Sequence, residues 1–318
     1  MRQLTRALLG AVITLLLLAG TAQAKDTLTV AHDQWIGYSG FFIAQAKGFF
    51  AAQDLDIKAT GFSGPGDTLP PLLAGHVDIA LTTLYNLGLV AGKGDNPLVA
   101  VYLLDTSNGA DAIVAAPGIT KPTELKGKAV AVTTGEVNEL LLIKALESAG
   151  LTEKDIRMVN MNADDAGAAL LAKRVDAAVT WEPWVSKAKS AGGNIVFSSR
   201  ETPNLILDAV TVTPQTLSAK RDAVVRFLRA LDQGVAYLRA HPDESRAIIG
   251  NALSVPAGDV TGMLAGDKIY SSADNKELMA AGGPGFRSVE EVAKFLTSHE
   301  LINRKLDSAA LLTDDLLP

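Results

Sequence analysis

An internal repeat is the feature that most constrains the fold of this chain. The run LLAGHVDIALTT at Leu72 to Thr83 returns as LLAKRVDAAVTW at Leu170 to Trp181, 98 residues later. The segments around both runs keep the same order, and each copy reads as strand, loop, helix, strand, helix, strand. A period of this length is the size of a domain, not of a solenoid unit. The fold class is therefore α/β, with two similar lobes that each contain a parallel sheet.

The second copy should be an insertion in the first lobe. The segment from Leu217 onward is mainly helical and holds no third copy, so we expect it to return and cover lobe 1. Two extended segments, Leu103 to Ala112 and Asn204 to Val212, are the predicted crossings between the lobes. The predicted divisions are a signal peptide at 1–24, the first segment of lobe 1 at 25–108, the inserted lobe 2 at 109–208, and the return of lobe 1 with the C-terminal helices at 209–318.

The N-terminus is typical of an export signal. Arg2 and Arg6 precede the run ALLGAVITLLLLAG, and the small residues of AQA predict cleavage after Ala24. The alternative, a membrane anchor, would need about 20 apolar residues. The chain has no cysteine, which excludes both a lipid anchor at the cleavage point and a disulfide scaffold. We therefore expect a soluble periplasmic protein without direct membrane insertion.

Charge narrows the choice of partner. The formal net charge is −6, and removal of the signal with its two arginines would make it −8. An acidic surface argues against nucleic acid or an anionic membrane as the partner. A small-molecule ligand is the remaining expectation.

The repeat also predicts where a ligand binds, because ligands of open parallel sheets lie beyond the carboxyl ends of the strands. All three tryptophans of the chain fall in the loops at those ends, so we expect indoles to face a cleft between the lobes. The candidate ligand-binding residues are, in lobe 1, Asp33, Trp35, Tyr38, Thr82, Thr83 and Tyr85; at the crossings, Asp105 and Asp208; and in lobe 2, Thr133, Thr134, Glu136, Asn138, Trp181, Glu182 and Trp184.

Several of these residues have a purely structural alternative. Trp35 or Trp184 can pack inside a lobe, as most large aromatic side chains do. Thr133 and Thr134 can cap the helix that follows them, and Glu136 can complement its dipole. Glu182 has few structural reasons to lie between two indoles, which favours a role in the pocket.

Several runs of the chain resemble those of a known family. The runs WIGYSGFFIAQAKGFF, LKGKAVAV and VTWEPW, with the repeated pair above, are similar to solute-binding proteins of ABC importers in the nitrate, sulfonate, taurine and thiamine-pyrimidine group. The resemblance implies a type II periplasmic binding protein, a monomer that closes on its ligand by hinge motion and delivers it to a membrane permease. It implies ligand contacts after the first strand, at the helix start from Thr133 to Asn138, and at the aromatic pair flanking Glu182.

Signatures of catalysis are absent from the sequence. The four histidines lack metal-ligand spacing, and GFSGPG at Gly61 to Gly66 is followed by no Gly-Lys-Ser/Thr, so it is not a phosphate loop. We therefore expect no enzyme, no metal and no cofactor. Two rivals stay open on the same fold: a periplasmic enzyme with Glu136 or Glu182 as general base, and a sensor that docks on a signalling protein.

The charges of the cleft loops predict the ligand. The loops carry Asp33, Asp105, Glu136 and Glu182 but no lysine or arginine. Carboxylates beside indole faces suit a cation or a zwitterion, whose positive end should meet Glu182 between Trp181 and Trp184 with Glu136 or Asp33 as second partner. The alternative is a sulfonate, taurine or nitrate held by hydroxyls and helix N–H groups. The run TTGEVNE at the helix start departs from the serine-rich sequence of sulfonate binders.

Overall fold

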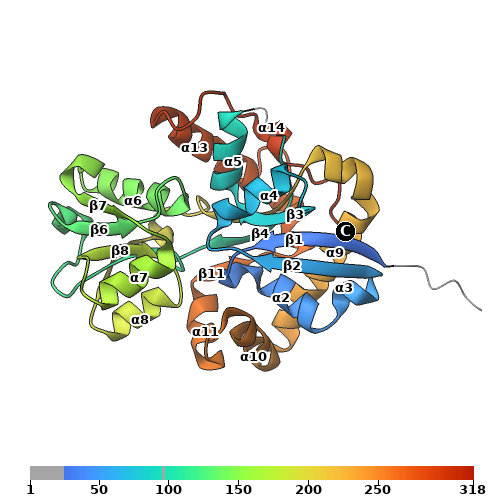
Figure 1. Ribbon diagram of the computed structural model, residues 1–318, viewed down its shortest axis with the longest axis horizontal. Helices are drawn as coiled ribbons and strands as arrows, with labels where there is room; N and C mark the ends of the chain where they lie inside the picture. Colours follow the sequence, from blue (N-terminus) through green and yellow to red (C-terminus); the bar gives the residue numbers. More distant parts are fainter. Residues whose placement is uncertain (1–24, 95–96) are drawn as a thin grey trace, which may run out of the picture.

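The computed structural model describes residues 25–94 and 97–318, and the predicted signal peptide at 1–24 lies outside this range. Two separate sheets, each flanked by helices, form two lobes side by side (Figure 1). This arrangement confirms the predicted α/β class with two lobes. Lobe 1 is the part built on the six-stranded sheet, and lobe 2 is the part built on the five-stranded sheet.

The six-stranded sheet of lobe 1 has the order β11-β4-β10-β3-β1-β2. Its strands are β1 (Asp26–His32), β2 (Leu55–Gly61), β3 (Ile79–Thr83), β4 (Val99–Ser107), β10 (Leu207–Val212) and β11 (Asp267–Ile269). Strands β1, β2 and β3 are parallel, whereas β10 runs antiparallel to both β3 and β4. The antiparallel strand is the one that returns from lobe 2.

Lobe 2 repeats this plan. Its order is β7-β6-β8-β5-β9, from β5 (Ala112–Ala115), β6 (Ala129–Val132), β7 (Arg157–Asn160), β8 (Ala177–Thr180) and β9 (Asn194–Ser198). The order β7-β6-β8 matches β2-β1-β3, and the strand that arrives from lobe 1, β5, is again antiparallel to its neighbour β8.

Side-chain bonds follow the repeat as well. The Asp78 carboxylate accepts from the backbone N–H of Thr29, and Asp176, 98 residues later, accepts from that of Ala129, both at 2.8 Å. These bonds tie β1 and β6 to the residue directly before the neighbouring parallel strand, β3 or β8. The repeated sequence therefore specifies the same joint in each lobe.

The lobes are joined by two crossings. Residues 108–111 lead from β4 to β5, and residues 199–206 lead from β9 back to β10. Because β10 pairs with β4, Asp208 lies directly opposite Asp105 beside both crossings. In the first crossing Asn108 and Ala110 donate their N–H groups to the Gly266 carbonyl, which ties it to the start of β11.

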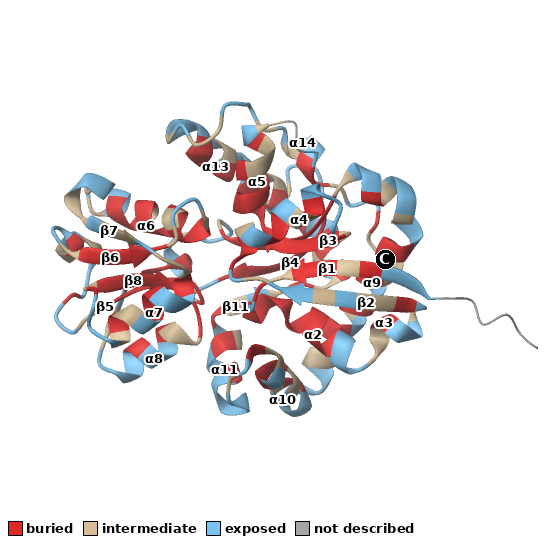
Figure 2. Ribbon diagram, in the orientation of Figure 1, coloured by how far each residue is buried: buried red, intermediate tan, exposed pale blue. Residues whose placement is uncertain are grey.

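Helices cover both faces of each sheet, and the inner strands β3, β4, β6 and β8 are buried, whereas the edge strands β2 and β7 are largely exposed or half-buried (Figure 2). In lobe 1 the helices before the first crossing are α2 (Ser39–Ala46), α3 (Phe49–Ala52), α4 (Leu69–Leu73) and α5 (Leu84–Lys93). Lobe 2 contributes α6 (Val137–Ser148), α7 (Ala163–Leu171) and α8 (Trp184–Ser190). The C-terminal helices are α9 (Pro214–Ala240), α10 (Pro242–Leu253), α11 (Ala257–Ala265), α12 (Ser272–Leu278), α13 (Pro284–Ser298) and α14 (Ser308–Leu311).

The long helix α9 packs on α2 and α3 of lobe 1. At their crossing a Cβ on Gly234 would lie 2.0 Å from the Gly40 carbonyl oxygen, so only glycine permits this approach of the two helices. Among helices in the described ranges, none is both long and apolar enough to cross a membrane.

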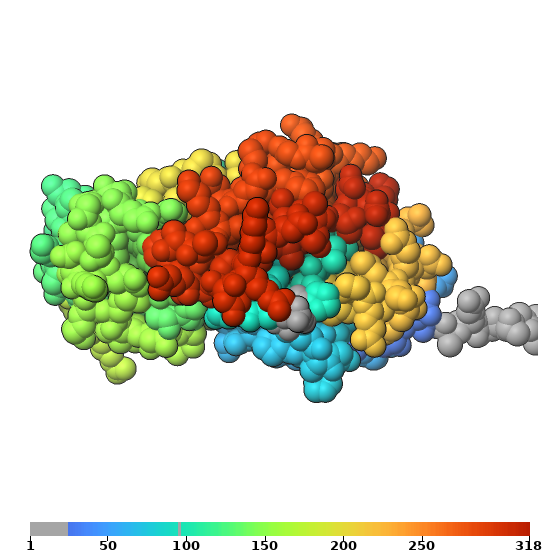
Figure 3. Space-filling model, turned by 90° about the horizontal axis from the view of Figure 1, so that it is seen from above, coloured from blue at the N-terminus to red at the C-terminus, as the bar shows by residue number. Residues whose placement is uncertain are grey.

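Helix α13 belongs to lobe 1 but reaches lobe 2. Its Phe295 ring packs 6.3 Å from Tyr85 of α5, and Lys144 of α6 lies 5.3 Å from the centre of the same ring. His299, directly after α13, lies 3.9 Å from the Glu147 carboxylate of α6. Figure 3 shows this orange-red segment against the green surface of lobe 2. The lobes therefore also touch away from the crossings.

Candidate ligand-binding site

A narrow cavity lies between the two lobes at the carboxyl ends of the strands. Its volume is only about 10 Å³, room for about one water molecule, whereas typical ligand pockets have roughly 300–1,000 Å³. The structure thus shows lobes that are nearly shut. The residues that line the cavity are Asp33, Trp35, Pro65, Thr83, Asp111, Val137, Trp181, Ile206 and Asp208.

Lobe 1 supplies the acidic wall of this cavity. Trp35 donates its indole N–H to Asp105 at 3.1 Å, and Tyr38 donates its hydroxyl to Asp208 at 2.8 Å. Tyr38 and Asp105 are fully buried behind the lining residues. These two bonds hold the loop after β1 against the strands of the crossings. Trp35 and Tyr38 thus orient the wall.

Carboxylate oxygens in this wall lack partners. Asp33 is only 3% exposed and its Oδ1 accepts no hydrogen bond, and the same holds for Oδ2 of Asp105. Burial, with the neighbouring charge of Asp208 as second cause, raises the pKa of Asp33 well above its usual value. Since burying an unpaired carboxylate costs several kcal/mol, this wall favours a positive group beside it.

Two more acids at the cavity also have pKa values that burial raises. Burial raises the pKa of Asp208 to about 7 and that of Asp111 to about 6. Both line the cavity, and no lysine or arginine does so within the described part of the chain. In residues 25–94 and 97–318, no three acids or histidines converge in an arrangement that would hold a metal ion.

The two indoles at the cavity come from opposite lobes. Trp35 follows β1 and Trp181 follows β8, and their rings meet edge to face with centroids 6.3 Å apart. Each is nearly buried, at 5% and 6% exposed. The tryptophan pair thus spans the cleft, one ring on each side.

The other predicted residues of lobe 2 bond within their own lobe. Thr133 donates its hydroxyl to the Met161 carbonyl, and the N–H of Thr134 donates to Asn160. The Glu182 carboxylate accepts from the N–H and the hydroxyl of Ser186, one turn into α8, at 3.1 and 2.9 Å. The carboxylate that the sequence places between two indoles therefore caps its own helix.

Trp184 points away from the interlobe cavity. Its indole donates to Asp164 of α7 at 2.7 Å, and Lys187 lies 4.4 Å from the ring. A Cβ on Gly167 would lie 2.5 Å from the Trp184 side chain, so this ring packs on α7. The structure brings Trp181 together with Trp35 and separates both from Trp184.

Four predicted residues lie at the helix starts. Thr82 donates to the Pro65 carbonyl at 2.8 Å, and Thr83 caps α5 by accepting from the N–H of Asn86. Tyr85 and Asn138 are buried with side-chain polar atoms that have no partner. These atoms add neutral hydrogen-bonding capacity where α5 and α6 begin.

Two acids at or near the cavity were not among the site residues predicted from the sequence. Asp111 lines the cavity, and its position in the first predicted crossing was a usable signal. Asp267 lies on β11 next to Asp105, and neither of its buried oxygens has a partner. Its strand has only three residues between helices, so the sequence carried no readable sign of it.

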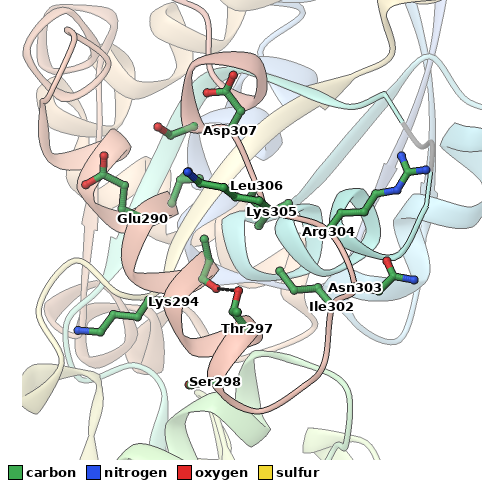
Figure 4. Close-up of a pocket in the computed structure, with 13 residues that line it drawn as sticks. Glu290, Lys294, Thr297, Ser298, Ile302, Asn303, Arg304, Lys305, Leu306 and Asp307 are labelled. Carbon is green, nitrogen blue, oxygen red and sulfur yellow. Dashed lines mark hydrogen bonds between the residues drawn. The ribbon is translucent and has the colours of Figure 1, made fainter.

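A larger groove of about 1,150 Å³ lies elsewhere, between α13 and residues 302–308 (Figure 4). Its basic side chains Lys294, Arg304 and Lys305 point in different directions. Because no set of polar groups converges there, the interlobe cavity is the better candidate.

Comparison with known proteins decides the family. Residues 35–245 match the model of the family described as NMT1/THI5 like. The chain belongs to this family. The matched range includes both crossings, so it contains every residue that lines the interlobe cavity except Asp33.

Individual relatives are distant. The chain is 28% identical over 232 residues to a putative thiamine biosynthesis protein of Haemophilus influenzae, covering 70% of this chain and 72% of the relative. It is 25% identical over 269 residues to the taurine-binding periplasmic protein of Escherichia coli, covering 80% and 81%. The relatives are thus named for more than one kind of compound.

The fold matches solved structures of binding proteins. The alkanesulfonate-binding protein SsuA of Xanthomonas axonopodis pv. citri, bound to MOPS, superposes with a TM-score of 0.78 at 18% identity, covering 92% of this chain and 99% of that one. The nitrate-binding protein NrtA of Synechocystis PCC 6803 gives 0.73 at 14% identity, covering 92% and 87%. These matches confirm the predicted periplasmic binding protein fold.

Proposed function

We propose that this protein is the extracytoplasmic substrate-binding protein of an ABC-type importer, and that its ligand is a small cation or zwitterion. The protein would act as an exported monomer that captures the ligand between its lobes and hands it to a membrane permease. The family and the names of the relatives support the general role. The ligand class rests on this chain's own residues.

The observation that carries the ligand class is the unpaired carboxylate of Asp33. Closing the lobes buries Asp33 beside Asp111 and Asp208 without a counterion from the protein. A ligand cation would offset that desolvation through charge-assisted hydrogen bonds. Trp35 and Trp181 would add cation–π attraction of about 0.5–2 kcal/mol per ring. The ligand therefore closes a cleft that resists closing without it.

The positive end of the ligand is assigned to Asp33 and Asp208 of lobe 1, and no longer to Glu182. Glu182 already accepts two hydrogen bonds from Ser186 of α8, whereas Asp33 has an unpartnered oxygen at the cavity. A zwitterion such as taurine fits this assignment, since its ammonium group can meet the carboxylates. Its sulfonate would then contact neutral donors such as Asn138 and Tyr85.

The lobes should move as the units predicted from the sequence, 25–108 with 209–318 against 109–208. Rotation about residues 108–111 and 199–206 would widen the cavity, which is too small to admit most solutes as it stands. Small-angle scattering with and without ligand tests this motion, and identical profiles would exclude it.

The ligand class is tested by a thermal-shift screen. The panel contains quaternary ammonium compounds, aminopyrimidines, amino-sulfonates, simple sulfonates and nitrate. A ligand at 100 times its dissociation constant should stabilise the fold by about 2.7 kcal/mol. We expect hits only among compounds that carry a positive group. A shift with nitrate or a simple sulfonate, but with no cation, would overturn the assignment, and recovery of a chemically altered ligand would favour an enzyme.

A further inference from the structure

One carboxylate crosses the cleft and contacts the backbone of the opposite lobe. Glu136 stands at the start of α6 in lobe 2, and its Oε2 accepts from the N–H of Gly66 in lobe 1 at 3.4 Å. Gly66 belongs to the short 3-10 turn Pro65–Thr68, which follows β2. This contact exists only while the lobes are together.

Two glycines of lobe 1 leave room for this carboxylate. A Cβ on Gly64 would lie 3.3 Å from Oε1 of Glu136, and its three nearest atoms would all belong to Glu136. A Cβ on Gly66 would lie 2.6 Å from the same oxygen and 2.6 Å from Asn86 Nδ2. Gly64 has extended backbone, φ −161°, that any residue adopts. Glycine is therefore needed at position 64 to leave room for Glu136 of the opposite lobe, and not to allow the backbone conformation of the turn.

The surroundings of Glu136 disfavour its charge. The groups that face it are Asp67 from the turn, Asp33 from the loop after β1, and Tyr85 with Asn86 from α5. Burial, with the charge of Asp67 as a smaller cause, raises the pKa of Glu136 from 4.5 to about 7. Opening the cleft would expose this carboxylate and return its pKa toward 4.5.

We propose that Glu136 is a closure residue, which docks on the Gly64–Gly66 turn most readily as the neutral acid and so makes the lobes close more easily as the pH falls. This inference rests on the proposed hinge motion but not on the nature of the ligand. It assigns Glu136 to the contact between the lobes and not to ligand recognition.

The sign follows from proton linkage. A carboxyl group whose pKa is higher in the closed state takes up a proton on closing. The ratio of closed to open molecules should therefore rise by up to about tenfold per pH unit as the pH falls from 7 toward 4.5, and by roughly thirtyfold between about pH 8 and pH 5.5. Above pH 7 the ionised carboxylate opposes closure.

Interlobe distances in the ligand-free protein test this inference directly. Since the chain has no cysteine, spin labels can be attached at Lys58→Cys in lobe 1 and Lys126→Cys in lobe 2. Pulsed electron paramagnetic resonance then measures the distance between the two labels. We expect the wild type to shift toward the closed distance between about pH 8 and pH 5.5. Glu136→Gln, which mimics the neutral acid, should be more closed than the wild type at pH 8 and equal to it at pH 5.5.

A matched control lies on the same helix. Glu139 also has a raised pKa because of burial, but its carboxylate accepts from Gly135 within lobe 2. Glu139→Gln should change the response to pH less than Glu136→Gln does, because the Glu139 carboxylate is bonded within lobe 2, although Tyr85, Lys93 and His299 of lobe 1 lie near enough to affect it. Asp33, Asp105, Asp111, Asp208 and Asp267 are common to all three proteins, so the difference between them isolates Glu136. Equal distances for wild type and Glu136→Gln at both pH values would overturn the inference, including the case in which both stay open.

The glycines provide a second, steric test. Gly64→Val should push Glu136 out of the turn and hold the lobes open at both pH values, and adding Glu136→Ala should restore closing. Gly61→Val is the control, because a Cβ there has only a His32 carbon, 4.0 Å away, within contact range. Circular dichroism melts show whether each variant folds. A folded Gly64→Val protein that closes like the wild type would contradict the inference.

These experiments use no ligand. A ligand screen that finds only anions would therefore refute the proposed ligand class and leave the role of Glu136 standing. Conversely, an unchanged response to pH in Glu136→Gln would remove the closure residue without affecting the proposed function.

Discussion

The two walls of the cleft come from the same repeated sequence plan but differ in how their polar groups are used. In lobe 2 the carboxylate of Glu182 and the indole of Trp184 bond to Ser186 and Asp164 of their own lobe. In lobe 1 Asp33 ends beside the cavity with an oxygen that has no partner. The repeat thus sets the position of a loop, and local pairing decides whether that loop is free to bind a ligand.

The largest expected effect is the loss of ligand affinity when Asp33 is changed, which contrasts with the small loss expected for Glu182. Asp33→Asn keeps the shape of the side chain and removes the charge from the lobe 1 wall. Loss of a charge-assisted hydrogen bond to the ligand cation should weaken binding by about 2–4 kcal/mol, on the order of 100-fold. Isothermal titration with a cationic compound from the screen measures this loss. Unchanged affinity would show that lobe 1 does not recognise the positive group.

Asp208 should show opposite effects on stability and binding. Because its pKa is raised to about 7 in the folded protein, Asp208 destabilises the fold as the pH rises from about 4 to 7, when it must lose its proton. Asp208→Asn should raise the stability of the ligand-free protein by about 1–3 kcal/mol at pH 8, and this gain should vanish toward pH 4. Cation binding should nevertheless weaken.

Thermal melts over this pH range check the Asp208 prediction. A variant that is less stable than the wild type at pH 8 would mean that the bond from Tyr38 stabilises the ionised carboxylate more than burial destabilises it.

Two tryptophan variants compare the walls through stability alone. Trp35→Phe removes the donor to the buried Asp105 carboxylate and should cost about 1–3 kcal/mol. Trp184→Phe removes a donor to Asp164, an exposed residue, and should cost less than about 1 kcal/mol. Urea denaturation of both variants measures the difference, and equal losses would mean that the two loops are equally structural.

The smallest effect is expected at Glu182. Its carboxylate is occupied by Ser186, so Glu182→Gln should change the affinity for a cation by less than about threefold, although capping of α8 weakens slightly. Titration under the conditions used for Asp33→Asn gives the comparison. A loss as large as that of Asp33→Asn would reverse the roles assigned to the two walls.

The sequence predicted the lobes and their loops well, because repeated apolar strands at a domain-sized period leave few alternative folds. The prediction that indoles face the cleft holds in the structure for Trp35 and Trp181, which follow the equivalent strands β1 and β8. The roles of the predicted ligand contacts stay proposals that the variants above test.

The sequence could not show which acids are satisfied locally. Glu182 accepts a hydrogen bond from Ser186 four residues later, and Trp184 donates one to Asp164 on a neighbouring helix. In the sequence, neither side chain differs from one that has no partner. Asp267 could not be predicted for another reason. It lies on a three-residue strand at the edge of a sheet, which is too short to show a periodic sequence pattern.

The position of β10 has a consequence for how the chain folds as it is made. β10 lies inside the sheet of lobe 1, between β3 and β4, but follows all of lobe 2 in the chain. The sheet of lobe 2 has all its strands once Ser198 has emerged, whereas that of lobe 1 must wait for Val212 before β3 can be joined to β4. The half that begins first therefore finishes last, and until then two of its strand edges stay open to wrong partners.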